Sequence, residues 1–435
     1  MPSSSLRRRQ IAIVALLFVG YASLYFCRAD LSVATPLLIE ELRTQGLTQA
    51  DALWWVGTIT SVGTFGYALG KLFLGGLGDY WGGRISFLIG LAGAALFTVL
   101  FALTGMLPFF TLAWFGNRLT QSLSWAGLIK LSSKWFNFSS YGTVIGILSV
   151  SFLVGDAVAR QLMGSLLHHG YDWRTLFYFG AGVAAVCFTL NFLFLRESRT
   201  ALGFGEARTN PLNLFSQSES RPPSVSALVK PLFRSPAFQL VCLLSFTLTI
   251  VRETFNNWTP EYLHAYLGYS AGDAGSRSAI FPGVGAISVL IVGWLSDRLG
   301  VNGRAILMFI GLSTATAALV ALMSVPASAG ASLMPLFAIG GVAFCLLGPY
   351  SYLGGAFALD FGGKQGSALA SGMIDGIGYL GGILAGTSIT QISSAYGWQG
   401  VFVALAGLTA ISAVAAGVLY ALRQRAAAIQ QPVQP

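Results

Sequence analysis

The sequence predicts an all-α membrane protein with twelve transmembrane helices in two pseudo-symmetric six-helix bundles. The first reason is composition: 54% of the 435 residues are hydrophobic and only 9% are charged, whereas a soluble globular protein carries about 25% charged residues. The second reason is a series of long apolar runs, and the third is an internal repeat. This composition excludes an ordinary soluble enzyme, a nucleic-acid-binding protein and a disordered scaffold.

The apolar runs give the expected helices in order. A helix needs about 20 apolar residues to cross the hydrocarbon core of a bilayer. Twelve such runs lie near 11–40, 51–77, 85–105, 108–133, 143–167, 174–195, 236–263, 276–296, 304–325, 332–359, 366–391 and 398–422. The first run is too long for a signal peptide and is not followed by a small-residue cleavage site, so we expect it to remain as the first helix.

A polar, proline-containing stretch interrupts these runs between Arg196 and Arg234. Such a stretch is typical of a linker between domains. The sequence therefore predicts an N-terminal six-helix half over 1–195, a cytoplasmic linker over 196–235 and a C-terminal six-helix half over 236–435.

The charge distribution predicts the orientation in the membrane. Most of the 25 Lys and Arg residues fall in loops on one side, and the other side has only Arg43, Arg174 and Arg277. By the positive-inside rule, both termini and the linker lie in the cytoplasm. The net charge of +9 therefore reports topology, and we expect a multi-pass protein of the cytoplasmic (inner) membrane with the lipid bilayer, and no nucleic acid, as its partner.

The two halves repeat a short loop motif. Gly75-Gly-Leu-Gly-Asp79 after the second run returns as Gly293-Trp-Leu-Ser-Asp297 after the eighth, half a chain later. Parallel six-helix repeats are the plan of the major facilitator superfamily, in which substrate binds near mid-membrane between the halves. The two loops resemble the signature of that superfamily, and the resemblance implies that Asp79 and Asp297 gate the cytoplasmic side.

A second repeat places an arginine in the first helix of each half. Arg28 and Arg252 are each followed eight residues later by a proline. An arginine at mid-membrane costs at least about 2.5–3.5 kcal/mol, so we expect the two to face a central cavity and to bind an anion, for which the guanidinium fork is suited. The alternative is pairing with Asp30 or Glu253, but residues one or two positions apart on a helix point in different directions.

Polar side chains follow each arginine at helical spacing. The first stripe contains Tyr21, Tyr25, Arg28, Ser32 and Thr35, and the second contains Ser245, Thr249, Arg252, Asn256 and Thr259. Hydroxyl groups beside an arginine suit a polar ligand. The alternative interpretation is a polar seam between helices, which would not by itself require the arginines.

The motifs around these stripes resemble a more specific group. Gly-Tyr-Ala-Ser-Leu-Tyr-Phe-Cys-Arg over 20–28 is similar to the first helix of the organophosphate:phosphate antiporter family. Further matches are Tyr67, Lys71, Gln121, Trp125, the Trp-Thr-Pro after Arg252, Gly348-Pro349 and the segment around Tyr379. The resemblance implies alternating access with exchange of an organophosphate for inorganic phosphate. It also implies that Arg28 and Arg252 bind the phosphoryl group, and that Tyr21, Tyr25, Tyr67, Lys71, Gln121 and Tyr379 line the cavity; Trp125 and Asn256 complete the expected substrate-binding set.

The sequence departs from that family at two positive positions. Ala29 stands where glycerol-3-phosphate exchangers carry a basic residue, and Gly155 falls where they carry a histidine. Asp156, Glu253 and Asp375 add acids in or near the helices. A less positive cavity favours a second hypothesis, a proton-coupled transporter of a carboxylate, a phosphonate or a zwitterion.

The remaining buried charges have two interpretations each. Asp156 and Arg160, four residues apart, either neutralise each other or form a switchable pair in the cavity. Arg118 is either structural or tied to proton coupling. Asp375 is either a hydrogen-bonded helix contact or the site of a coupling proton or substrate amine, and Lys71 is either a ligand or an ion-pair partner.

No catalytic or cofactor motif is present. There is no P-loop and hence no sign of ATP, no set of nucleophile, base and orienting residue, and no metal-ligand spacing among the four cysteines. We therefore expect no enzyme, metal or cofactor, and transport driven by exchange, a gradient or protons. A membrane sensor of a sugar phosphate is the alternative of another class, and a monomer is the usual state of the superfamily.

Overall fold

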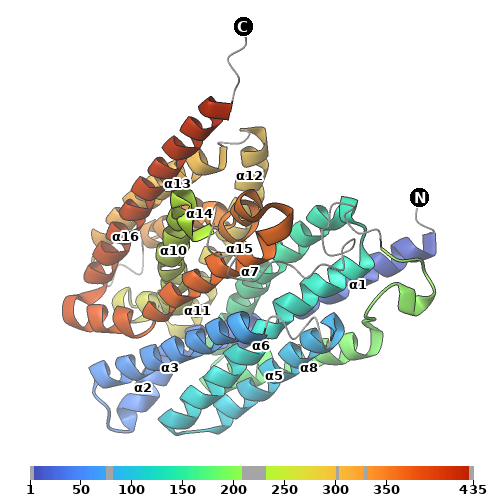
Figure 1. Cartoon of the computed structure of the whole chain (residues 1–435). Helices are drawn as coiled ribbons and strands as arrows, with labels where there is room; N and C mark the ends of the chain where they lie inside the picture. Colours follow the sequence, from blue (N-terminus) through green and yellow to red (C-terminus); the bar gives the residue numbers. More distant parts are fainter. Residues whose placement is uncertain (1–3, 75–81, 208–231, 300–302, 328–331, 431–435) are drawn as a thin grey trace. The chain divides into compact units, whose positions relative to one another are not determined.

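The computed structural model describes residues 4–74, 82–207, 232–299, 303–327 and 332–430, and these are α-helical with short 3-10 and π-helical turns (Figure 1). As far as the described residues reach, each of the twelve predicted apolar runs falls mainly on helix, so the predicted all-α fold is confirmed. Within the described residues, eight helical stretches are both long and apolar enough to span a membrane. The helix over 107–135 is not among them because it carries polar side chains, and these build the candidate site described below.

The described helices belong to two compact units. The first unit comprises Met1–Pro211 with Asn256–Gly283, and the second comprises Leu212–Phe255 with Val284–Pro435.

The first unit contains most of the N-terminal helices. They are α1 (Ser4–Ser23), α2 (Phe26–Thr44), α3 (Gln49–Leu69) with the π-helix η1 (Gly70–Leu74), α5 (Gly83–Leu103), α6 (Leu107–Trp135), α7 (Phe138–His168), α8 (Trp173–Phe194) and the short 3-10 helix η2 (Thr200–Leu202). The π-helix η4 (Tyr262–Tyr266) and α11 (Ala271–Ser278) also belong to this unit. Helix α6 packs on α3 and α5, α8 packs on α2 and α5, and α11 packs on α7.

The second unit contains the C-terminal helices. They are α10 (Pro236–Glu261) up to Phe255, α12 (Ile280–Arg298) from Val284, α13 (Gly303–Met323), α14 (Met334–Tyr350), the π-helix η5 (Leu353–Phe357), α15 (Ala358–Leu384) and α16 (Thr387–Gln430). Helix α13 packs on α14 and α16. A break inside α16 at Gly397, where φ is +69°, separates the last two predicted runs, because only glycine adopts that backbone conformation without strain.

The end of α2 is tied to the start of α8 by an ion pair. Arg174 donates to both carboxylate oxygens of Glu41, each at 2.7 Å, and the Trp173 indole donates to the same carboxylate at 2.6 Å. A bidentate arginine–carboxylate pair fixes the angle between its partners. This contact holds α2, and with it Arg28, in a defined place within the first unit.

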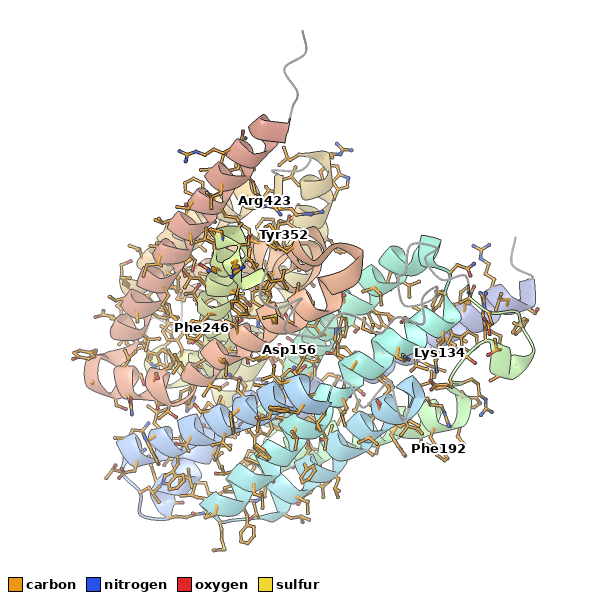
Figure 2. The ribbon with its side chains drawn as sticks, in the orientation of Figure 1. Lys134, Asp156, Phe192, Phe246, Tyr352 and Arg423 are labelled. Carbon is orange, nitrogen blue, oxygen red and sulfur yellow. The ribbon has the colours of Figure 1, made fainter. Side chains whose placement is uncertain are left out.

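At the other end of the unit, Glu197 caps the N-terminus of α5. Its carboxylate accepts from the backbone N–H groups of Gly83 at 3.0 Å and Arg84 at 2.7 Å, and Lys134 of α6 donates to it at 2.5 Å (Figure 2 labels Lys134). Burial alone would raise the pKa of this carboxyl, but the hydrogen bond from Lys134 and the two backbone N–H groups together hold the pKa below its usual range.

This cap predicts a pH-dependent contribution to stability. Because the folded pKa of Glu197 is lowered, its contribution is present above the unfolded pKa of about 4.3 and is lost as pH falls through the folded value. Glu197→Gln should therefore lower the melting temperature of the purified protein near neutral pH, with the difference from wild type narrowing in acid. Glu206→Gln, at an exposed linker position, is the control; an equal loss in both variants would contradict the capping role.

Candidate functional site

The first membrane-crossing stretch is broken beside Arg28. Helix α1 ends at Ser23, α2 begins at Phe26, and Cys27 has non-helical angles of φ −86° and ψ 18°. The run over 11–40 thus forms two helices where one was expected, and the polar stripe crosses the break. Discontinuous helices at mid-membrane are a common way of building transporter binding sites, because the break places polar groups where a continuous helix would not.

Hydrogen bonds to Gln121 and Tyr25 orient the guanidinium of Arg28 within the first unit. Its Nε donates to Gln121 Oε1 of α6 at 2.7 Å, and its Nη1 donates to the Tyr25 hydroxyl at 3.0 Å. Its carbon Cζ lies 4.8 Å from the ring centroid of Tyr25 and 4.5 Å from that of Tyr67. These contacts fix the orientation of the positive charge before any ligand binds.

Gln121 is itself fixed by a second layer of hydrogen bonds. Its Nε2 donates to Asn117 Oδ1 at 2.6 Å and to the Cys27 carbonyl at 3.2 Å, and Asn117 donates to Thr98 at 2.8 Å. Asn117 is fully buried. Asn117 is not among the residues predicted from the sequence; its position one turn before Gln121 on α6 was the signal that could have found it.

Three cations share the ring of Tyr67. Besides Arg28, the Arg118 guanidinium lies 5.0 Å from its centroid and the Lys71 ammonium lies 5.5 Å from it. A cation over an aromatic face is stabilised by the ring quadrupole. Lys71 comes from the π-helix η1, and such turns are frequent at functional sites. Arg118 and Lys71 therefore lie in the same positive cluster as Arg28.

Tyr21 and Trp125 border this cluster on the side of α1. The Tyr21 ring lies 6.1 Å from that of Tyr25 and 5.2 Å from that of Trp125. The structure therefore brings together eight of the residues singled out in the sequence, which we call the Arg28 cluster: Tyr21, Tyr25, Arg28, Tyr67, Lys71, Arg118, Gln121 and Trp125.

Asp156 and Arg160 form a buried ion pair on α7. Arg160 Nε lies 2.9 Å from Asp156 Oδ1. The side chain of Arg160 is 3% exposed and that of Asp156 is 7% exposed (Figure 2 labels Asp156). Arg160 also donates to the carbonyl of Asn256 at 2.6 Å and to the Ser278 hydroxyl at 3.1 Å. The pair has the geometry of mutual neutralisation. Through Arg160, it also ties the backbone at Asn256 of α10 to α7.

The position before Asp156 has no room for a side chain. A Cβ built on Gly155 would lie 2.6 Å from the carbonyl oxygen of Ala22 and 2.8 Å from its Cα. Helix α7 therefore meets the backbone of α1 directly. Gly155 contacts Ala22, which lies just before the break beside Arg28. A larger side chain at position 155 would therefore collide with the backbone of α1.

Arg252 lies in a second cluster, in the second unit. Its Nη2 donates to Glu253 Oε1 at 2.5 Å and to the Tyr379 hydroxyl at 3.3 Å. Its Cζ lies 4.7 Å from the ring centroid of Tyr350 and 5.7 Å from that of Tyr379. We call these four residues the Arg252 cluster; Tyr350 directly follows the Gly348-Pro349 motif, which was the signal that could have found it.

The expectation that Glu253 points away from Arg252 is wrong. Both side chains are long enough to meet despite their neighbouring positions on α10, and both are largely buried, at 12% and 7% exposed for Arg252 and Glu253. Leaving a buried charge without a partner costs several kcal/mol, which outweighs the less favourable side-chain geometry. For Asp30 the described contact is the backbone N–H of Leu31, at 2.7 Å.

The other predicted acids are placed only in part. Asp375 lies on α15 against η5, since a Cβ built on Gly354 would be 2.5 Å from its Oδ1. Asp79 lies outside the described residues, and for Asp297 only the backbone, in α12, is described. Among the described residues, no group of His, Cys, Asp and Glu side chains could hold a metal ion.

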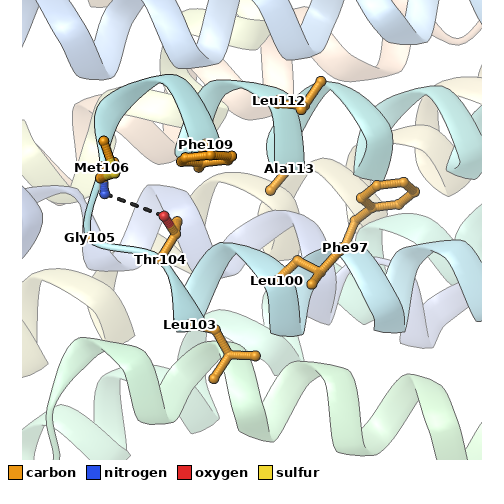
Figure 3. A pocket seen from close by; sticks show the side chains of 9 residues that line it. All are labelled: Phe97, Leu100, Leu103, Thr104, Gly105, Met106, Phe109, Leu112 and Ala113. Atoms are coloured by element: carbon orange, nitrogen blue, oxygen red, sulfur yellow. Dashed lines mark hydrogen bonds between the residues drawn. The ribbon is translucent and has the colours of Figure 1, made fainter.

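A separate pocket of about 480 Å³ lies at the turn between α5 and α6. Figure 3 shows that apolar side chains line it, with the Met106 backbone N–H donating to the Thr104 hydroxyl at 3.3 Å. Leu103, Met106 and Leu112 of its lining are 67%, 60% and 63% exposed. None of the predicted site residues lines it, and its apolar, exposed lining suits lipid tails better than an ion.

Comparison with known proteins identifies the family. The model of the Major Facilitator Superfamily matches residues 17–386. The chain belongs to the major facilitator superfamily. It is therefore a multi-pass membrane transporter and not an enzyme, as the sequence analysis expected.

Individual relatives of this superfamily protein cover nearly its whole length. A probable hexose phosphate transport protein of Chlamydia pneumoniae is 27% identical over 93% of this chain and 89% of its own. A glycerol-3-phosphate transporter of Bacillus subtilis is 23% identical over 92% and 89%. These relatives match the organophosphate:phosphate antiporter family, so that resemblance is confirmed.

Solved structures agree on the fold. The crystal structure of a bacterial homologue of the human lysosomal transporter Spinster, inward-facing and unoccupied, superposes with a TM-score of 0.76 at 16% identity, covering 95% of this chain and 97% of that one. At this identity the likeness establishes the fold alone.

The contact between α7 and α1 predicts a sharp difference between two glycines of the same helix. Gly155→Ala should lower stability by about 1–3 kcal/mol, because its methyl group would overlap the backbone of Ala22. Gly146→Ala is the matched control, since no described atom outside its own helix backbone lies within 4 Å of a Cβ there. Thermal unfolding of both variants in detergent checks this; equal melting temperatures would contradict the close helix contact.

Proposed function

We propose that this transporter exchanges an organophosphate for inorganic phosphate across the membrane by alternating access, and that Arg28 and Arg252 bind the phosphoryl group. The observation that carries the proposal is the Arg28 cluster, where three cations surround one tyrosine ring. The names of the relatives support the substrate class, since they include hexose phosphate and glycerol-3-phosphate transport proteins.

The chemistry of the Arg28 cluster suits a phosphoryl group. Like charges within a low-dielectric protein repel one another, and an anion placed among them removes that repulsion. A guanidinium offers a planar fork of donors that matches phosphate oxygens, and Lys71 adds a compact charge. Because Gln121 and Tyr25 already orient Arg28, little side-chain entropy is lost on binding.

The Arg252 cluster supplies a comparable group in the other unit. The Nε of Arg252 is buried and has no hydrogen-bond partner within the part of the chain that the structure describes. A buried donor without a partner costs about 1–3 kcal/mol, and an anion bound there would remove this cost. Tyr379 and Asn256 complete the proposed substrate-binding set.

The transport cycle that we propose follows the superfamily plan. The halves, divided at 1–195 and 236–435, would rock about a fixed site, with Asp79 and Asp297 gating the cytoplasmic side. The charge distribution supports an inner-membrane protein with both termini in the cytoplasm. We propose that the protein works as a monomer, with Asp156 and Arg160 as a structural pair.

Removing the charge of Arg28 tests the proposal. Arg28→Gln should reduce the exchange rate by roughly tenfold to hundredfold, the range expected for lost hydrogen bonds to a charged group. The measurement is counterflow in proteoliposomes loaded with labelled phosphate, with hexose phosphate or glycerol-3-phosphate added outside.

The matched control is Arg43→Gln, at the exposed end of the same helix, where Arg43 pairs only with Glu40 among the ion pairs described. This variant should exchange at the wild-type rate. Undiminished exchange by Arg28→Gln, or wild-type protein that never releases phosphate to an external organophosphate, would contradict the proposed function.

A further inference from the structure

We propose that Glu253 is an internal competitor of the transported anion, so that anion binding at Arg252 is accompanied by protonation of Glu253. This inference rests on the proposed function, because it takes Arg252 to be an anion-binding residue. It adds a specific role for Glu253, which is to decide when Arg252 is available and how many charges move with the substrate.

The geometry shows one guanidinium already occupied by an anion. Arg252 Nη2 donates to Glu253 Oε1 at 2.5 Å and to the Tyr379 hydroxyl at 3.3 Å, while Arg252 Nε has no hydrogen-bond partner among the described residues. Glu253 is therefore already bound at the Nη2 that lies beside the unused Nε donor. A tetrahedral anion that needs two parallel donors meets a carboxylate already bound to the group it would use.

Burial prevents Glu253 from simply moving into water. Its side chain is 7% exposed, and that of Arg252 is 12% exposed. If Glu253 stayed ionised, an incoming anion would place two negative charges beside one buried positive charge. At low dielectric that arrangement is strongly unfavourable. Protonation of Glu253 resolves it, because the neutral carboxylic acid releases Arg252 and keeps the local charge balanced.

Arg28 provides the contrast within the same protein. It donates to Gln121 and to Tyr25, which are both neutral groups. A neutral partner does not change its charge as an anion arrives, whereas an ionised one must. The cost of receiving a phosphoryl group at Arg252 therefore depends on pH.

Other titratable groups surround the pair. From α14, Tyr350 faces the guanidinium, and from α15 Tyr379 does so, with Asp375 one turn before Tyr379 and against η5. A tyrosine has an ordinary pKa of about 10 and stays neutral in the range of interest. Asp375 is thus the residue from which the effect of Glu253 must be separated by experiment.

The test measures binding of inorganic phosphate to the purified full-length protein between about pH 5.5 and 8. Phosphate itself titrates in this range, so the quantity compared is the ratio of affinities of Glu253→Gln and wild type at each pH. The ratio should be close to one in acid and rise to about tenfold at the alkaline end. The reason is that the apparent affinity of wild type scales with the fraction of protein in which Arg252 is not bound to Glu253.

Two further variants separate Glu253 from its surroundings. The ratio of the phosphate affinities of Asp375→Asn and wild type should not rise with pH. Glu261→Gln removes another buried carboxylate further along α10, and its ratio to wild type should not rise with pH either. A pH-independent ratio for Glu253→Gln, or a ratio that rises for Asp375→Asn instead, would overturn the inference.

If Glu253→Gln fails to fold because Arg252 is left without a counter-ion, wild-type protein still decides the question. Infrared difference spectra on adding phosphate should then show a protonated carboxyl band appearing and a carboxylate band disappearing. Unchanged carboxyl bands on saturation with phosphate would overturn the inference.

Arg252→Gln distinguishes failure of this inference from failure of the proposed function. Wild-type phosphate affinity in Arg252→Gln, or no phosphate binding by wild type, would remove the proposed role of Arg252 and this inference with it. Loss of affinity in Arg252→Gln with a flat Glu253→Gln ratio would overturn the role of Glu253 alone.

Discussion

A guanidinium that is taken out of water needs an anion or an aromatic face beside it, and this requirement organises both clusters. In the first unit, Arg28, Arg118 and Lys71 all lie over Tyr67. In the second unit, Arg252 lies over Tyr350 and bonds to Glu253. Aromatic faces stabilise a cation without neutralising it.

Helix packing serves this constraint. The break between α1 and α2 sets Tyr25 and Arg28 at the start of a new helix, and Gly155 lets α7 meet α1 just before the break. The Glu41 and Arg174 pair fixes the far end of α2. The helix bundle is the rigid scaffold that keeps the three cations over Tyr67 from moving apart.

The sequence predicted what depends on composition and periodicity, and missed what depends on tertiary contacts. The twelve helical runs follow from hydropathy, and the importance of Arg28 and Arg252 follows from their repeat. The break at Leu24 and Tyr25 has no hydropathy signal, because a run is equally apolar whether straight or broken. The contact of Glu253 with Arg252 depends on side-chain conformations that only the surrounding burial decides. That the two arginines face each other stays a prediction, since they belong to different units.

Ligand-induced stabilisation tests most directly whether the buried arginines bind a phosphoryl group. Thermal unfolding of the purified protein would be followed with increasing glycerol-3-phosphate, hexose phosphate or inorganic phosphate, each against potassium chloride at equal ionic strength. A ligand that binds only the folded state raises the melting temperature. At a concentration of a hundred times its dissociation constant, it raises the free energy of unfolding by about 2.7 kcal/mol. We predict such a rise with phosphate and at least one of the two esters. Equal melting temperatures in phosphate compounds and chloride would contradict the account.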